Sequence, residues 1–110
     1  MRELVNQRRA RSNLTPLSWD RELSRIAHDL AAAVGRGDSN VGRRRYNVAL
    51  TRSRFQAVET QQVIAGSFSQ LAELEIWAQA EVGIVGMGIV AIEDGEHEGA
   101  LVLIVAVGAR

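Results

Sequence analysis

The apolar positions of the chain follow a helical spacing in the first half and form strand-like runs in the second. Residues 2–11 carry Leu4 and Val5 on one side and arginines on the other, which predicts a short helix. A longer apolar stripe follows at i, i+3, i+4, i+7, i+8 and i+11, the pattern of a helix that buries one face. Its members are Leu23, Ile26, Ala27, Leu30, Ala31 and Val34.

The second helix has recognisable start and stop signals. Ser18 or Asp20 can cap its beginning, and Gly35 is expected to end it. The connector between the two helices contains Pro16, which interrupts helical structure, and Leu17, which we expect to anchor the connector on the core.

The middle of the chain gives weaker signals. Residues 35–45, "GRGDSNVGRRR", read as a polar loop, and residues 46–50, "YNVAL", as a strand. The stretch from Thr51 to Ser67 fits two alternatives. One is a helix that starts at Ser53, and the other is a strand over residues 57–65.

A short helix and a β-hairpin are predicted for the remainder. Ser69 can cap a helix that ends near Gln79. Two strands follow, over residues 82–92 and 100–107, joined by a hairpin with an Asp94-Gly95 turn.

The composition of these two strands indicates how they pack. The second, "ALVLIVAV", is apolar on both faces, which predicts a central strand that is covered on both sides. Gly83, Gly86 and Gly88 in the first predict close approach of a neighbouring helix or backbone.

The order of elements, helices first and a terminal antiparallel hairpin last, predicts an α+β fold with helices flanking a sheet, in a single domain over residues 1–110. With 46% hydrophobic and 24% charged residues, the composition is that of a globular domain. The chain has no cysteine, which excludes disulfides and thiolate metal sites.

Membrane and export signals are missing from the sequence as read. No apolar run reaches the length of a membrane-spanning helix, and no apolar segment of a signal peptide follows Met1. Two interpretations remain open, a cytoplasmic protein or a domain cut from a longer precursor, and we favour the precursor.

The charges are distributed unevenly, although the net charge is zero. Up to Gln56 there are twelve arginines against five acidic residues, and afterwards one arginine against eight. The densest basic patch consists of Arg43, Arg44, Arg45, Arg52 and Arg54. It could contact phosphates or an acidic polymer. A solvated surface is the favoured interpretation, and pairing with the acidic half, in the same chain or a neighbour, is the next. The scarcity of nearby aromatic residues argues against nucleic acid.

Several motifs resemble the CAP superfamily of cysteine-rich secretory, antigen 5 and pathogenesis-related 1 proteins, also called SCP-like. "LVNQRRARSNLTPLSWDRELSRIAHDLAAAV" is similar to the family's opening helix, connector and second helix. Trp77, "VGMGIV" and "LVLIVAVG" match its later helix and final strands in order and spacing. The resemblance implies an α-β-α sandwich.

The resemblance also implies where a cleft should lie. Many CAP domains carry two histidines and two acidic residues there, which can bind a divalent metal. The matching positions differ in this chain: residues 38–41 contain no histidine, Gln61 or Gln62 replaces the glutamate, and no histidine follows Trp77 closely. We therefore predict a degenerate cleft at Gln61, Gln62 and Trp77, with no catalytic residue, no metal ligand and no cofactor.

The sequence thus predicts a non-catalytic binding module. The resemblance places it outside a bacterial cell or on the envelope, with a protein, lipid or polysaccharide as ligand. One alternative is a hydrolase or metal-dependent enzyme with a relocated site, which would require His28 and His97 to converge. Another is a structural domain that forms homo-oligomers through complementary charge, weakened by salt.

Overall fold

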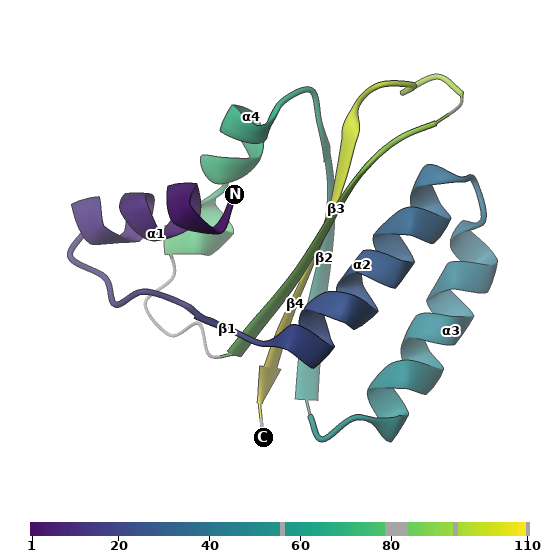
Figure 1. Ribbon diagram of the computed structural model, residues 1–110, viewed down its shortest axis with the longest axis horizontal. Coiled ribbons are helices and arrows are strands. Elements are labelled where there is room, and N and C mark those ends of the chain that lie inside the picture. Colours follow the sequence, from purple (N-terminus) through teal and green to yellow (C-terminus); the bar gives the residue numbers. More distant parts are fainter. Residues whose placement is uncertain (56, 79–83, 94, 110) are drawn as a thin grey trace.

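The computed structural model describes residues 1–55, 57–78, 84–93 and 95–109 and consists of three layers, with a sheet between two groups of helices (Figure 1). One face of the sheet is covered by α1 (Arg2–Arg11), α4 (Phe68–Ala72) and the 3-10 helix η1 (Glu75–Ala78). The other face is covered by α2 (Arg21–Gly35) and α3 (Ser39–Arg52). The predicted α-β-α sandwich is confirmed.

The sheet has four strands in the order β1-β3-β4-β2. They are β1 (Ser18–Trp19), β2 (Ala57–Ala65), β3 (Ile84–Ala91) and β4 (Leu101–Ala109). β4 pairs antiparallel with both β3 and β2, whereas β1 pairs parallel with β3. The hairpin of β3 and β4 confirms the predicted terminal hairpin, although Asp94 of its turn lies outside the described residues.

The apolar character of β4 follows from its central position. The hydrophobic core consists of two clusters, one on each face of the sheet. Val102 and Ile104 belong to the cluster formed with α2 and α3, and Leu103 and Val105 belong to the cluster that contains Trp77. All four β4 side chains are almost completely buried. Because alternate side chains of a strand point to opposite faces, a strand covered on both sides needs apolar residues at every position, and the prediction of a central strand is confirmed.

Two glycines of β3 allow α2 to lie directly on the sheet. A methyl group added at Gly86 would overlap the backbone of Leu23, and one added at Gly88 would overlap the backbone of His28. Any side chain there would push α2 off the strand, since neither obstacle is a flexible side chain. The predicted close approach is confirmed at these two positions, and Gly83 lies outside the described residues.

The ends of α2 agree with the sequence signals. The backbone N–H of Leu23 donates to Oδ2 of Asp20 at 2.8 Å, so Asp20 is the capping residue, while Ser18 lies in β1. The helix ends at Gly35, as predicted.

The prediction for residues 35–50 was wrong, because most of the expected polar loop and the whole expected strand belong to α3. Gly42, Tyr46 and Ala49, at i, i+4 and i+7, form the side of α3 that packs toward α2. A methyl group at Gly42 would lie 2.5 Å from Cβ of Ala33, so the glycine is a helix contact here. The glycine and the run of arginines are typical of loops, and they interrupt the apolar i, i+3, i+4 pattern by which the helix could have been predicted.

The two alternatives for residues 51–67 are also decided. Ser53 follows the last residue of α3, so no helix starts there, and the strand alternative over residues 57–65 is correct.

The next helix begins earlier than expected, because Ser67 and not Ser69 caps α4, accepting from the N–H of Gln70 at 3.3 Å. The chain continues as η1 to Ala78, and the predicted end at Gln79 lies outside the described residues.

Candidate functional site: a basic groove on the outer helix pair

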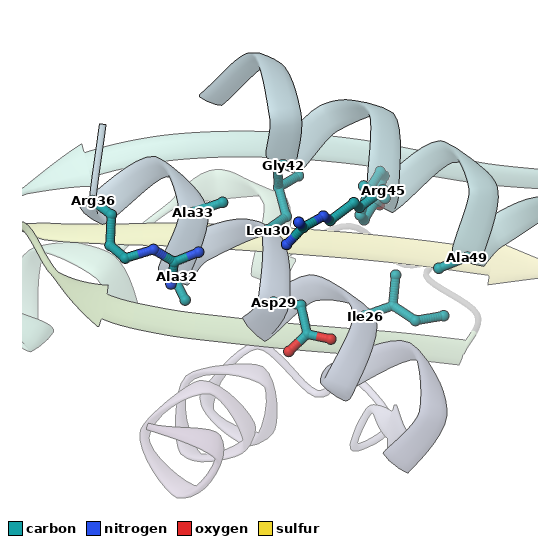
Figure 2. Close-up of a pocket in the computed structure, with 10 residues that line it drawn as sticks. Ile26, Asp29, Leu30, Ala32, Ala33, Arg36, Gly42, Arg45 and Ala49 are labelled. Atoms are coloured by element: carbon teal, nitrogen blue, oxygen red, sulfur yellow. The ribbon is translucent and has the colours of Figure 1, made fainter. Parts of the chain in front are cut away.

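A groove made of two adjoining pockets lies along the contact between α2 and α3, and Figure 2 shows the residues that line the first pocket. At one end it forms a pocket of about 210 Å³ with Leu30, Ala33 and Gly42 in its wall. At the other end it widens to a depression of about 580 Å³ that includes Val48 and Arg52. Both parts share Ile26, Arg45 and Ala49, so we treat them as one site, the α2–α3 groove.

Arginines outnumber acidic residues in the lining of this groove. The two parts together contain five arginines and two acidic residues, an excess of three positive charges (5 − 2 = 3). The arginines are Arg25, Arg36, Arg44, Arg45 and Arg52. Both acidic residues already have cationic neighbours: Asp29 lies 3.7 Å from Arg25, and Glu22 lies 3.9 Å from Arg54.

Three arginines of α3 carry most of the uncompensated charge. Arg44, Arg45 and Arg52 are exposed, and within the described part of the chain no carboxylate lies within ion-pair distance of any of them. Arginine stays protonated at any physiological pH, and its planar guanidinium can bind phosphate or carboxylate through two parallel hydrogen bonds. The α2–α3 groove is therefore suited to anions.

The same helix exposes apolar side chains beside these arginines. Val41 is 42% exposed and Val48 is 50% exposed. Val41, Arg45, Val48 and Arg52 follow one another at i, i+4, i+7 and i+11, so they form a single line along α3, and the last three of them line the groove. The surface thus alternates valine and arginine.

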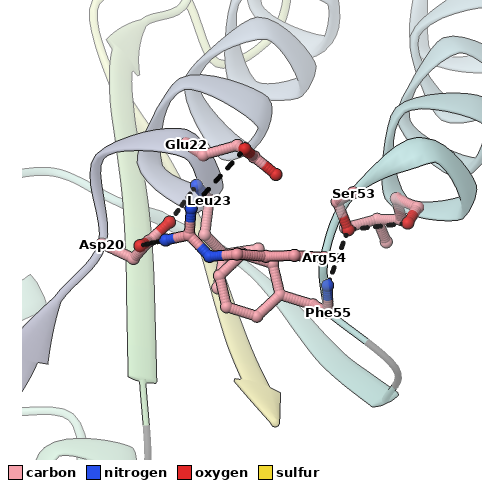
Figure 3. Close-up of polar contacts among 7 residues, drawn as sticks. Asp20, Glu22, Leu23, Ser53, Arg54 and Phe55 are labelled. Carbon is pink, nitrogen blue, oxygen red and sulfur yellow. Dashed lines mark hydrogen bonds and ion pairs between the residues drawn. The ribbon is translucent and has the colours of Figure 1, made fainter. Parts of the chain in front are cut away.

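The predicted basic patch is divided by the structure. Arg43 lies on α3 but points to the sheet side, where its Nη2 donates to Oε1 of Gln62 at 3.2 Å. Arg54 lies beyond the end of α3 and bonds the carboxylate of Asp20 (Figure 3). Only Arg44, Arg45 and Arg52 remain in the groove.

The sequence interpretation missed Arg25 and Arg36, which reach the groove from α2. Arg25 lies on the polar side of the apolar stripe and could have been assigned to the exposed face. Its place beside the other arginines requires α3 to be a helix, and that element was predicted as a loop and a strand.

The predicted cleft does not bring its three residues together. Gln61 and Gln62 are both exposed and occupy neighbouring positions of β2, so their side chains point to opposite faces of the sheet. Gln62 lies on the α3 side, where Arg43 contacts it. Trp77 is 1% exposed within the core of the other layer, and its indole N–H donates to the carbonyl of Leu71 at 2.7 Å.

The two histidines lie on separate elements, His28 on the exposed side of α2 and His97 in the loop between β3 and β4. Across the described ranges, no group of three or more His, Asp or Glu residues is placed to hold a metal ion.

Tyr46 links the groove to the sheet. Its ring lines the pocket and its hydroxyl shares a hydrogen bond with the hydroxyl of Thr60 on β2. Burial raises the pKa of the Tyr46 phenol, and the hydrogen bond with Thr60 acts in the opposite direction. Tyr46 therefore stays neutral at physiological pH and fixes α3 beside β2.

These features define an α-β-α module with a basic groove on one helical layer. The sequence profile of the CAP family, described as the cysteine-rich secretory protein family, matches residues 2–97, and the chain belongs to this family. It does so without any cysteine. No curated protein and no solved structure matches the chain. Among the described residues, no helix has both the length and the apolar character needed to span a membrane.

Proposed function

We propose that this CAP domain is a non-catalytic binding module whose ligand carries anionic groups and binds in the α2–α3 groove. The observation that carries the proposal is the cluster of Arg44, Arg45 and Arg52, which are exposed and lack a carboxylate partner among the described residues. Like charges on adjacent turns of a helix repel one another. An anion between them removes this repulsion and gains charge-assisted hydrogen bonds.

The family's metal cleft supplies the argument against catalysis. The positions that match its glutamate hold Gln61 or Gln62, which are neutral amides and poor metal ligands. The candidate histidines, His28 and His97, are exposed on separate elements. The name of the family describes secreted proteins, and we propose that this domain too is exported or attached to a bacterial envelope.

Binding to a soluble polyanion tests the proposal. Heparin serves as the probe, with binding measured by titration calorimetry at low and high salt. We expect binding that weakens with salt, because exposed charges are screened, and that weakens further in Arg45→Gln and Arg52→Gln. Arg11→Gln is the matched control, because Arg11 is an exposed arginine of α1 in the other helical layer.

Three outcomes would contradict the proposal: no binding, equal loss in the Arg11→Gln control, or binding that ignores salt. A rise in thermal stability on addition of zinc, in contrast, would support the alternative of a metal-dependent enzyme.

Self-assembly through charge remains a second candidate, favoured by the acidic loop between β3 and β4. Glu93, Glu96 and Glu98 are exposed there, and the described residues provide none of them with an ion pair. The loop of one copy could therefore bind the α2–α3 groove of another. Sedimentation velocity tests this: oligomers at low salt that dissociate at high salt and are absent in Arg45→Gln support it, and a monomer at all salt concentrations refutes it.

A further inference from the structure

We propose that β2 pairs antiparallel with the β2 strand of a second copy of this chain, so that the sheets of two copies join into one. This inference goes beyond the proposed function, because it concerns the edge of the sheet and not the α2–α3 groove. β2 ends the strand order β1-β3-β4-β2, and within the described part of the chain β4 is its one strand partner. The N–H and C=O groups on the other side of β2 can therefore bond a further strand.

The two edges of the sheet are built differently. β1, at the opposite edge, has only two residues, and short edge strands are one way in which proteins prevent their sheets from joining. β2 has nine residues, which pair with β4 in a continuous register from Ala57 to Ala65, without a bulge. The strand contains no proline, lysine or arginine, and Glu59 is its single charged residue. β2 thus lacks the features that protect long edge strands.

The sequence of β2 fits an antiparallel copy of itself. A two-fold axis perpendicular to the sheet at Gln61, the middle residue of the strand, places each Gln61 opposite its counterpart. Thr60 then lies opposite Gln62 of the second copy, and Glu59 lies opposite Val63. Amide and hydroxyl groups can hydrogen-bond across such pairs. The two Glu59 residues are separated by four positions along the strands, about 14 Å, so the carboxylates do not face each other.

The side chains near this axis are open to solvent. Glu59, Thr60, Gln61 and Gln62 are all exposed, so a second strand can approach the edge without displacing any of them from the core. These polar side chains keep the free edge soluble, whereas the backbone hydrogen bonds form only when another strand is present. A second copy of the chain supplies a strand of matching length and polarity.

The charges beside the edge determine how salt should act on this dimer. Arg43 of α3 donates to Gln62 at 3.2 Å, on the face of the sheet that α3 covers. In the dimer the two Gln62 residues are separated by two positions along the strands, about 7 Å, so the two Arg43 side chains approach each other. Salt screens their repulsion. The edge-to-edge dimer should therefore be at least as stable at high salt as at low salt.

The dimer also fixes the relation between the two helical layers of each copy. A two-fold axis perpendicular to the sheet keeps each layer on its own side, so both α2–α3 grooves lie on the same face of the joined sheet. α3 contacts β2 through Arg43 and Tyr46, and α2 lies on its other side (Figure 1). The two α3 helices would thus be neighbours across the axis.

Sedimentation velocity over a wide range of protein concentrations tests the inference. We expect a reversible equilibrium of monomer and dimer in which the dimer persists at high salt. Gln61→Lys and Gln61→Glu each place like charges opposite each other, and each should raise the dissociation constant about fivefold. An equal mixture of the two variants pairs lysine with glutamate and should restore the dimer as a heterodimer. Gln7→Lys, which changes an exposed glutamine of α1, should dimerise like the wild type.

Amide hydrogen exchange shows whether β2 is the contact. Every second N–H of an edge strand points away from its neighbour in the sheet. These N–H groups of β2 should exchange more slowly at high protein concentration than at low concentration in the wild type, but not in Gln61→Lys. The N–H groups that bond β4 should stay protected in both proteins, which also shows that the variant is folded.

The results that would overturn the inference are equally specific. They are a monomer at every concentration, a dimer that ignores the charge at position 61, and a mixture of the lysine and glutamate variants that dimerises no better than either alone. A dimer that dissociates in salt and is lost in Arg45→Gln would also overturn it, and would assign the assembly to the acidic loop and the α2–α3 groove instead.

Discussion

Asp20 holds the start of α2 to the segment that follows α3, and its removal should measurably destabilise the fold. One carboxylate oxygen accepts from the N–H of Leu23 at 2.8 Å, and the other binds Arg54 (Figure 3). Asp20 is 7% exposed, so both interactions lie at the edge of the core. Replacing Asp20 by alanine therefore removes a helix cap and an ion pair together.

The expected loss in the free energy of unfolding is the sum of the contributions of these two contacts. Loss of an N-cap costs about 1 kcal/mol. The ion pair adds about 0.5–1 kcal/mol and not more, since the side chain of Arg54 is 50% exposed and also contacts Glu22 at 3.9 Å. Asp20→Ala should thus lower the free energy of unfolding by about 2 kcal/mol. Asp20→Asn should lose roughly half of this, because asparagine caps helices as well as aspartate does.

Urea unfolding followed by tryptophan fluorescence measures these differences, with Asp29→Ala as the control. Asp29 forms an exposed i,i+4 pair with Arg25, and its removal should cost no more than about 0.5 kcal/mol. A double-mutant cycle of Asp20→Ala with Arg54→Ala should give a coupling energy of about 0.5–1 kcal/mol. The reasoning is refuted if Asp20→Ala unfolds at the same urea concentration as Asp29→Ala, or if Asp20→Asn is as unstable as Asp20→Ala.

Three further predictions concern other parts of the fold. Gly88→Ala should destabilise the protein by about 2 kcal/mol or more in thermal unfolding, because the added methyl group overlaps the backbone of α2. Arg9→Ala should lower the free energy of unfolding by about 3 kcal/mol in urea, against less than about 0.5 for exposed Arg11→Ala, since buried Arg9 donates to two backbone carbonyls. Tyr46 is the single tyrosine, so phenolate absorbance should titrate above pH 10.0 in the folded protein and near that value in urea. The same raised pKa means that stability present below pH 10.0 is lost as the pH rises through the folded pKa, and Tyr46→Phe should remove this loss.

The elements that the sequence predicted well are those in which local pattern and tertiary packing agree. The stripe from Leu23 to Val34 is buried on one side as its spacing indicates, and the residues of β4 are apolar because both faces of that strand are covered. In both cases burial of the side chain alone determines which residue type is found at each position. The apolar pattern can therefore be interpreted without knowing which elements cover it.

The predictions of secondary structure were wrong where the role of a residue depends on the side chain against which it packs. Gly42 reads as a loop residue, but it lies against Ala33 in a helix contact. The groove could not be predicted for the same reason, because Arg25 and Arg45 become neighbours only when α3 is helical. The candidate cleft of Gln61, Gln62 and Trp77, in contrast, was inferred from a family pattern and stays a prediction, in which the alternation of β2 places the two glutamines on opposite faces.

The arrangement of strands has a consequence for the order of folding. β4 comes last in chain order among the described strands, yet it lies between β3 and β2. β2 has no strand partner in the described sheet except β4, with Ala57 beside Ala109 and Ala65 beside Leu101. During synthesis β2 must therefore wait, with its backbone hydrogen-bonding groups unpaired and Val63 not yet packed, until β4 leaves the ribosome. The sheet then closes late and through long-range contacts, which slow folding and leave the edge of β2 open to aggregation until β4 has been made.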